Sequence, residues 1–200
     1  MTVLSLVQWI RELRISMKRY ERTGKMTNEA KYEEYQMGSL NHSFIQARLV
    51  RLLPEDGFTI MTELSLDVSQ IDMKSFGLKI KEEIKPDISL YKGDYEPNLY
   101  EDVVKMSEMP TLVIEILSPT QGFSEVLVKF KAYFALGVTS CWLITPTLGA
   151  VTVCSAESYE AQNCKFFDIA HDTEVVDDVL DIRLPLQEVF RKNPKKTTEY

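Results

Sequence analysis

The spacing of apolar residues changes near residue 57, and this change limits the possible folds more than any other feature of the chain. Before it, apolar residues recur with helical spacing over residues 4–20 and 41–53, which predicts two amphipathic helices. A shorter helix is expected over residues 28–35, because a capping sequence precedes it and a glycine follows it. Beyond residue 57, apolar and polar residues alternate, as they do in half-buried strands.

The second half of the chain predicts a sheet crossed by one long helix. Residues 121–136 have helical spacing and end at Gly137, and a short terminal helix is expected over residues 184–189. Alternating or continuous apolar runs predict strands over residues 60–68, 84–91, 112–117, 140–145, 150–155 and 165–169. The chain is therefore expected to have an α/β fold of the α+β type.

Length and composition predict one globular domain rather than two. The chain has 200 residues, and its 44% hydrophobic content is enough for a sizeable core. Within the single domain 1–200, residues 1–26 are expected to form an N-terminal helical extension. Residues 191–200 are expected to be a flexible tail.

Cysteine usage and hydropathy indicate a cytoplasmic protein. Cys141, Cys154 and Cys164 are odd in number and include no C-x-x-C pair, so neither a disulfide framework nor a thiolate zinc site is predicted. The apolar N-terminus lacks the basic start and the cleavage site of a signal peptide. No run of about 18 apolar residues occurs, so no membrane span is expected.

The charge counts against a protein that coats nucleic acid. The formal net charge is −7, whereas lysines and arginines that neutralise phosphates supply most non-specific affinity for nucleic acid. A nuclease needs only a locally basic groove around an acidic metal site. Lysines do gather in the middle of the sequence, at Lys79, Lys81, Lys85, Lys92, Lys129 and Lys131.

Two acidic residues stand in predicted strands. The carboxylate of Asp87 shares a strand face with Ser89 and is expected to point away from the apolar face, which Ile84, Ile88 and Leu90 would form. Glu115 is flanked on both sides by apolar residues, where an ionised carboxylate is costly without a cation or hydrogen bonds. Taken alone, Glu115 fits a metal ligand, a buried salt bridge to a lysine and a strand-end residue that reaches solvent.

The helix predicted after Glu115 brings a lysine into consideration. Glu125, Lys129 and Tyr133 are spaced by four and stack along one side, and Lys129 can lean back towards the end of the strand. The spacing alone favours an ordinary ion pair between Glu125 and Lys129. Lys131 points elsewhere round the helix and is expected to be solvated.

Together Asp87, Glu115 and Lys129 suit phosphoryl transfer to water. Carboxylate oxygens are the ligands that Mg²⁺ and Mn²⁺ prefer, and such ions keep positions open for water and phosphate. A neighbouring lysine can stabilise the negative charge that develops on the phosphate.

Two motifs carry a family resemblance. The run KPDISLYKGD, followed by MPTLVIEILSPTQGFSEVLVKFKAYFALGVTSCWLITP, resembles the Uma-type family, which is classed with restriction endonucleases in the PD-(D/E)XK nuclease superfamily. The resemblance covers about residues 28–190, and its specific part is EILSP followed by a lysine four positions before a tyrosine. It implies a restriction-endonuclease-like fold, in which helices flank a mixed central β-sheet, with extra helices at the N-terminus.

The resemblance also implies residue roles. Asp87 and Glu115 would be metal ligands, and the backbone carbonyl of Ile116 would be a third. The superfamily lysine is expected two residues after the glutamate, where this chain has Leu117. In Uma-type sequences that role moves to the following helix, at the position of Lys129. Glu125 replaces an aspartate often found four positions earlier and keeps the charge.

Other polar residues are weaker candidates. His42 matches a histidine common at the start of the family's long helix and could approach the metal or the DNA, although a solvated or helix-capping histidine explains it too. Glu63 is expected to be exposed, and the alternative is a carboxylate that contacts the metal ligands but not the metal. His171 is given no role. The acidic run Asp172, Glu174, Asp177 and Asp178 is expected to be a solvated loop, because it lacks the spacing and the glycine of a calcium-binding loop.

The resulting hypothesis is a magnesium- or manganese-dependent endonuclease that cleaves DNA as a homodimer. The alternative is a non-catalytic protein of the same fold that binds nucleic acid or protein, which the leucine at position 117 and the acidic charge favour. A glycosidase that uses Asp87 and Glu115 as acid and base is disfavoured, because the two strand positions are buried and no aromatic cluster surrounds them.

Overall fold

The computed structural model describes residues 39–78, 82–119 and 121–190. The helices predicted over residues 4–20 and 28–35, the rest of the N-terminal extension and the tail 191–200 lie outside these residues. In the described part of the chain, no helix is both long enough and apolar enough to cross a membrane.

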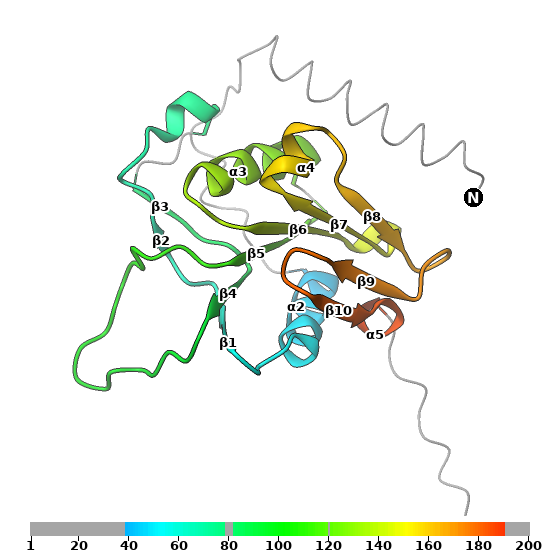
Figure 1. The fold of residues 1–200 in the computed structure, drawn as a ribbon, viewed down its shortest axis with the longest axis horizontal. Coiled ribbons are helices and arrows are strands. Elements are labelled where there is room, and N and C mark those ends of the chain that lie inside the picture. Colours follow the sequence, from blue (N-terminus) through cyan, green and yellow to red (C-terminus); the bar gives the residue numbers. More distant parts are fainter. Residues whose placement is uncertain (1–38, 79–81, 120, 191–200) are drawn as a thin grey trace, which may run out of the picture.

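A six-stranded mixed sheet forms the centre of the fold (Figure 1). Its strands follow the order β1-β4-β5-β6-β7-β8, and only β5 and β6 are parallel neighbours. Their bounds are β1 Phe58–Thr62, β4 Ile88–Lys92, β5 Leu112–Ile116, β6 Ser140–Thr145, β7 Ala150–Ser155 and β8 Lys165–Asp168. The mixed sheet and the fold class expected from the sequence are thereby confirmed.

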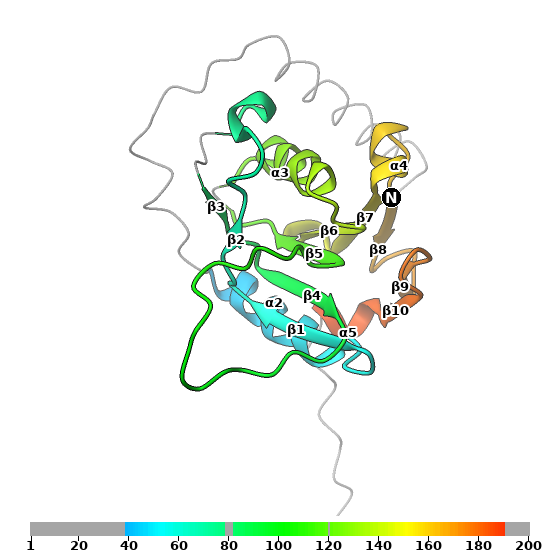
Figure 2. The same cartoon turned by 60° about the vertical axis from the view of Figure 1, so that its left-hand side comes forward.

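Both faces of the sheet are covered (Figures 1 and 2). One face carries α2 (Leu40–Leu52), α5 (Leu186–Phe190) and the hairpin of β9 (Glu174–Asp177) with β10 (Ile182–Pro185). The other face carries α3 (Phe123–Ala135), α4 (Ala156–Glu160), the short helix η1 (Met73–Phe76) and the pair β2 (Leu66–Asp67) with β3 (Glu83–Ile84). Strands buried on both faces read as continuous apolar runs, which explains the sequence of β5.

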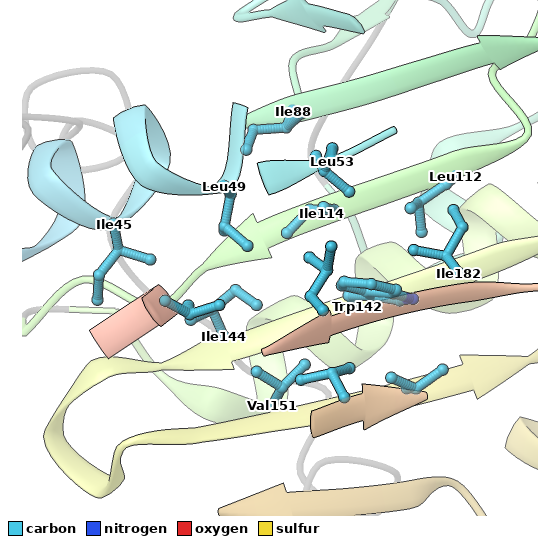
Figure 3. Packing of buried hydrophobic residues seen from close by; sticks show 14 of the residues in the cluster. Ile45, Leu49, Leu53, Ile88, Leu112, Ile114, Trp142, Ile144, Val151 and Ile182 are labelled. Carbon is cyan, nitrogen blue, oxygen red and sulfur yellow. The ribbon is translucent and has the colours of Figure 1, made fainter. Parts of the chain in front are cut away.

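The α2 side holds the larger apolar core. Trp142 lies at its centre, among side chains from α2, β5 and β10 (Figure 3). Successive residues of β6 alternate between the two cores: Trp142 faces α2, whereas Cys141 and Leu143 face α3. This two-sided packing fixes the register of the central strands.

Pro86 divides the strand predicted over residues 84–91 in two. A proline has no backbone N–H and cannot donate to a sheet ladder, so β3 ends at Ile84 and pairs with β2 outside the main sheet. Ile84 consequently packs in the α3-side core, not with Ile88 and Leu90 as predicted. The strand predicted over residues 60–68 is likewise split, into β1 and β2.

The prediction of a solvated acidic loop at residues 172–178 is wrong. Residues Glu174–Asp177 form β9, and Asp177 is 1% exposed. Its Oδ2 accepts hydrogen bonds from Ser140 Oγ at 2.6 Å and Trp142 Nε1 at 2.8 Å. These donors offset the cost of burying the carboxylate, and they lie far away in the sequence. The predicted terminal helix is also preceded by an unpredicted strand, β10.

The expectation that the cysteines form no disulfide is wrong as well. Cys154 and Cys164 are joined, although ten positions separate them. Cys154 lies in β7, and α4 turns the chain back so that the two Cα atoms are 4.7 Å apart, a distance that a disulfide can span. Cys141 is free and buried.

Candidate active site

Asp87 and Glu115 meet at one end of the central sheet. Asp87 immediately precedes β4, and Glu115 is the fourth residue of β5. The two strands are antiparallel, with Ile88 opposite Ile114, so the start of β4 lies beside the end of β5. Asp87 and Glu115, which are 28 positions apart in the sequence, are thus neighbours.

The carboxylate of Asp87 connects β5 with α2. Its Oδ2 accepts a hydrogen bond from the backbone N–H of Ile116 at 2.5 Å. If the pairing of β4 with β5 continued by two residues, Pro86 would lie opposite Ile116. Instead, the side chain of Asp87 supplies the acceptor for the Ile116 N–H at the end of the ladder. Its Oδ1 lies 3.1 Å from Nε2 of His42, in the first turn of α2.

Glu115 is held from the opposite side of the sheet by α3. Its side chain is buried, with Oε2 accepting from Nζ of Lys129 at 2.8 Å and Oε1 accepting from the hydroxyl of Tyr133 at 2.7 Å. Lys129 and Tyr133 are one turn apart on α3, so a single helix face supplies both donors. The lysine therefore reaches back to the strand, as its spacing allowed, and its close ion pair is with Glu115.

Burial is the largest single influence on the pKa of Glu115 and on that of Lys129, and it acts in opposite directions on the two. It raises the pKa of Glu115, and the nearby Asp87 carboxylate raises it further, while Lys129 and Tyr133 oppose the rise. Burial lowers the pKa of Lys129, but the negative charges of Glu115, Asp87 and Glu125 outweigh it and raise that pKa overall. Lys129 is thus a mostly shielded cation that pairs with one carboxylate and feels the charge of two more.

His42 belongs to the site and does not cap its helix. Ser39 is the N-cap of α2, and its side chain accepts from the backbone N–H of His42. The hydrogen bond to Asp87 raises the pKa of His42, with further contributions from the charges of Asp87, Glu63 and Glu115 against the effect of burial. The other ring nitrogen, Nδ1, is buried without a hydrogen-bond partner in the described part of the chain. That nitrogen is available to water or to an oxygen of a ligand.

Gln46 is a site residue that the sequence did not single out, and Tyr133 was placed on the same side of its helix as Lys129 but was given no role. Gln46 Nε2 donates to the backbone carbonyl of Asp87 at 2.9 Å and to Oε1 of Glu63 at 3.3 Å. Gln46 follows His42 by four positions, and Tyr133 follows Lys129 by four. Counting four positions, about one helical turn, from His42 and from Lys129 would therefore have found both residues.

Glu63 lies at the rim of the site. Its side chain is half-exposed and pairs with Lys85, whose Nζ is 3.5 Å from Oε2. Its backbone N–H donates to the Asp87 carbonyl at 3.2 Å, and its φ of 54° is in the left-handed region. Strained backbone of this kind tends to occur near functional sites. The expectation of an exposed side chain is therefore confirmed for Glu63.

The predicted lysine cluster does not assemble as a whole. Lys92 ends β4 opposite Phe58, at the far end of the strand from Asp87, and Lys131 is exposed, as predicted. Leu117 packs against the α3-side core. Lys129 forms an ion pair with Glu115, and Lys85 forms one with Glu63 at the rim of the site. Lys79 and Lys81 lie outside the described residues.

The oxygen donors fit a divalent cation of the magnesium type. In residues 39–78, 82–119 and 121–190, no three His, Cys, Asp or Glu side chains are grouped as in a protein-only metal cage. Mg²⁺, however, usually binds through one or two carboxylates together with waters and phosphate oxygens. Two neighbouring carboxylates beside the Ile116 backbone, with an unpartnered His42 nitrogen near them, meet that requirement.

Comparison with known proteins concerns the fold and the family of the chain. Among solved structures, the fold is similar to that of "a putative nuclease belonging to DUF820" from Anabaena variabilis ATCC 29413, with a TM-score of 0.56 and 22% sequence identity over 76% of this chain and 81% of that chain. A likeness at this identity concerns the fold alone. No curated protein matches the chain. Residues 31–187 match the model of the Uma2 family, described as "Putative restriction endonuclease". Because that match spans most of the 200 residues, the chain belongs to the Uma2 family.

Proposed function

We propose that this protein is a metal-dependent endonuclease that hydrolyses phosphodiester bonds in DNA. The observation that carries the proposal is the position of Glu115, which is buried beside Asp87 at the end of the sheet and is hydrogen-bonded to Lys129. A structural salt bridge needs one carboxylate. A second carboxylate beside the pair leaves negative charge that a divalent cation would balance.

Asp87, Glu115 and the backbone carbonyl of Ile116 would hold Mg²⁺ or Mn²⁺. A bound ion of this kind polarises a phosphate and makes a coordinated water more acidic. The chain itself keeps its ligands in place: His42 and the Ile116 N–H fix the Asp87 carboxylate, while Lys129 and Tyr133 fix that of Glu115. Such preorganisation reduces the cost of ordering the site when substrate binds.

Lys129 supplies positive charge where the phosphate would react. Its ammonium group is mostly shielded from water, and a charge in a low-dielectric site acts more strongly than it does in solvent. We assign it the stabilisation of negative charge that develops on the phosphate. Glu125, one turn earlier on α3, adds to the negative field that keeps Lys129 charged and has an accessory role.

The second candidate function is that of a non-catalytic member of the fold that binds nucleic acid or protein. Leu117, in the usual lysine position, and the net charge of −7 favour it. We also propose that the active form is a homodimer, by analogy with nucleases of this superfamily. Light scattering should then give about twice the 23.0 kDa chain mass.

Cleavage of supercoiled plasmid with Mg²⁺ or Mn²⁺ tests the proposal, with metal binding followed by calorimetry. Asp87→Ala, Glu115→Ala and Lys129→Ala should each lower the cleavage rate by at least about 100-fold, the effect typical of losing a group that stabilises the transition state. Lys131→Ala is the matched control, since this lysine is exposed on the same helix, and it should cleave normally. Cleavage that survives Asp87→Ala would refute the proposed site. Absence of both metal binding and cleavage in the wild type would favour the non-catalytic function.

A further inference from the structure

Large apolar side chains are exposed on two separate surfaces of this protein. In the described part of the chain, eight large apolar side chains are exposed, and seven of them fall into two groups of three and four. The group of three surrounds a hollow between α2 and the turn after β6. The group of four lies in the loop between β4 and β5, at Leu99, Tyr100, Val103 and Val104. Exposed apolar patches of this kind are typical of surfaces that contact another molecule.

The loop between β4 and β5 projects from the body of the protein and is held at both of its ends (Figures 1 and 2). At one end, the backbone N–H of Tyr95 donates to Thr59 Oγ1 of β1 at 2.9 Å. At the other end, the backbone N–H of Met106 donates to the Ser65 carbonyl at 2.8 Å. Residues 96–104, which we call the loop tip, belong to neither apolar core of the described structure. The anchored loop therefore presents an apolar tip to the outside.

The hollow has a volume of about 300 Å³ and a largely apolar wall. Helix α2 supplies Phe44 to this wall, and the short helix η2 (Pro146–Leu148) supplies Leu148. These two side chains are 41% and 46% exposed, and Leu40, next to the hollow residue Asn41, is 84% exposed. A concave apolar surface of this size can receive the side chains of a projecting loop.

The loop tip and the hollow lie at opposite ends of the sheet. The loop joins the end of β4 to the start of β5, so it leaves the sheet at the end opposite Asp87 and Glu115. Strand β6 is parallel to β5, and η2 follows the end of β6, so the hollow lies at the same end as these two carboxylates. Because the loop is anchored at both of its ends, its tip cannot reach the hollow of its own chain. A second molecule can bring a loop tip there.

The charges of the two surfaces are complementary. Helix α2 carries Arg48 and Arg51 and no acidic residue, and the guanidinium carbon of Arg48 lies 5.1 Å from the ring centre of Phe44 in the wall of the hollow. Opposite charges on two surfaces speed their association and favour the correct partner. The same acidic charge makes the loop tip a poor ligand for DNA phosphates and for an anionic membrane. Residues 94–104 contain four acidic side chains and no lysine or arginine: Asp94, Glu96, Glu101 and Asp102.

We propose that the loop tip of one molecule docks in the hollow of a second copy of this chain, whose own loop tip docks in the first molecule in the same way. Two copies that lie side by side with their sheets antiparallel bring each tip to the hollow of the other copy. Such a two-fold arrangement uses both surfaces of both molecules and closes after two copies. The proposal rests on the proposed homodimeric form and names its interface. Because the hollow includes Asn41, which adjoins His42 in the first turn of α2, each tip also lies beside the candidate site of the other copy.

Light scattering tests the interface with one variant on each surface, Val104→Glu in the loop tip and Leu148→Glu in the hollow. Each places a carboxylate in an apolar contact, so each should weaken dimerisation by at least about 30-fold, the loss typical of a hot-spot residue. Val179→Glu is the matched control, because this valine is also exposed but lies on neither surface. The wild type and the control should give about twice the 23.0 kDa chain mass, and the two test variants should give a lower mass. A monomeric wild type would overturn the proposal, as would test variants that dimerise as well as the control.

Crosslinking tests which surfaces meet. Chains with Val104→Cys and chains with Leu148→Cys are mixed and treated with a bismaleimide, which joins accessible thiols; the native Cys141 is buried, and Cys154 and Cys164 are bonded to each other. The mixture should give a covalent dimer that neither variant gives alone, because each joined pair takes one cysteine from a loop tip and one from a hollow. Absence of that dimer would overturn the proposal, and so would an equal yield from Val104→Cys alone, which would mean that two loop tips meet. A crosslinked dimer that cleaves no DNA would support the interface and refute only the catalytic proposal.

Discussion

Replacing Asp177 with alanine should lower the free energy of unfolding by about 3–5 kcal/mol, because this buried carboxylate joins the β9–β10 hairpin to the central sheet. Its Oδ2 accepts from Ser140 Oγ and Trp142 Nε1, and its Oδ1 accepts from the backbone N–H groups of Val179 and Leu180 at 3.1 and 3.2 Å. Hydrogen bonds to a charged group contribute about 1.5–3 kcal/mol each, and an unpaired buried donor costs about 1–3 kcal/mol.

The estimate follows from what the substitution would leave behind. Trp142 is fully buried, so its Nε1 would have neither its present partner nor water. Ser140 Oγ keeps a weaker bond to the Cys154 carbonyl at 3.3 Å, and the two backbone donors lie in the turn after β9. Removing a buried charge is favourable in itself, but it does not compensate when its partners stay in place. For a chain of this size, about 3–5 kcal/mol lowers Tm by roughly 10 °C.

Urea unfolding followed by circular dichroism measures the effect, with Asp178→Ala as the matched control. Asp178 is the next residue, is exposed, and pairs with Lys165 at the surface. Surface ion pairs contribute little to stability, so the control should leave the unfolding midpoint nearly unchanged. If Asp177→Ala is no more destabilising than Asp178→Ala, the hairpin is not held by this carboxylate and the reasoning from its hydrogen bonds is wrong.

Two further predictions concern the site and the disulfide. Tyr133→Phe removes only the hydroxyl that donates to Glu115, and it should weaken Mn²⁺ binding by about 10–100-fold in calorimetry. Tyr159→Phe, which removes a similar hydrogen bond to a backbone carbonyl of α3 outside the site, should leave that affinity unchanged; equal affinities in the two variants would contradict a positioning role. Replacing Cys154 and Cys164 together by alanine should lower the free energy of unfolding by roughly 2–3 kcal/mol, from the loop of ten positions that the bond closes. Dithiothreitol should lower the Tm of the wild type to about that of the variant, and it should leave the Tm of the variant unchanged.

The sequence alone determined the elements whose signal is local. Apolar periodicity predicted α2, α3 and the six strands of the main sheet, because a helix or strand with one or two buried faces repeats its pattern within a few residues. The same local signal marked Glu115, since a carboxylate within the run of apolar residues in β5 requires a partner. The family resemblance, carried by two short motifs, was confirmed over residues 31–187.

Packing between distant segments decided what the sequence left open or predicted wrongly. Asp177 looks solvated in its own neighbourhood, and only the donors from β6 make its burial possible. Lys129 has a carboxylate one turn away in Glu125, yet the packing of α3 on the sheet places its Nζ 2.8 Å from Glu115. Local spacing is set by the helix or strand itself and can be read along the chain. The partner of a charged group is set by the layers that cover it, and these come together only in the tertiary structure.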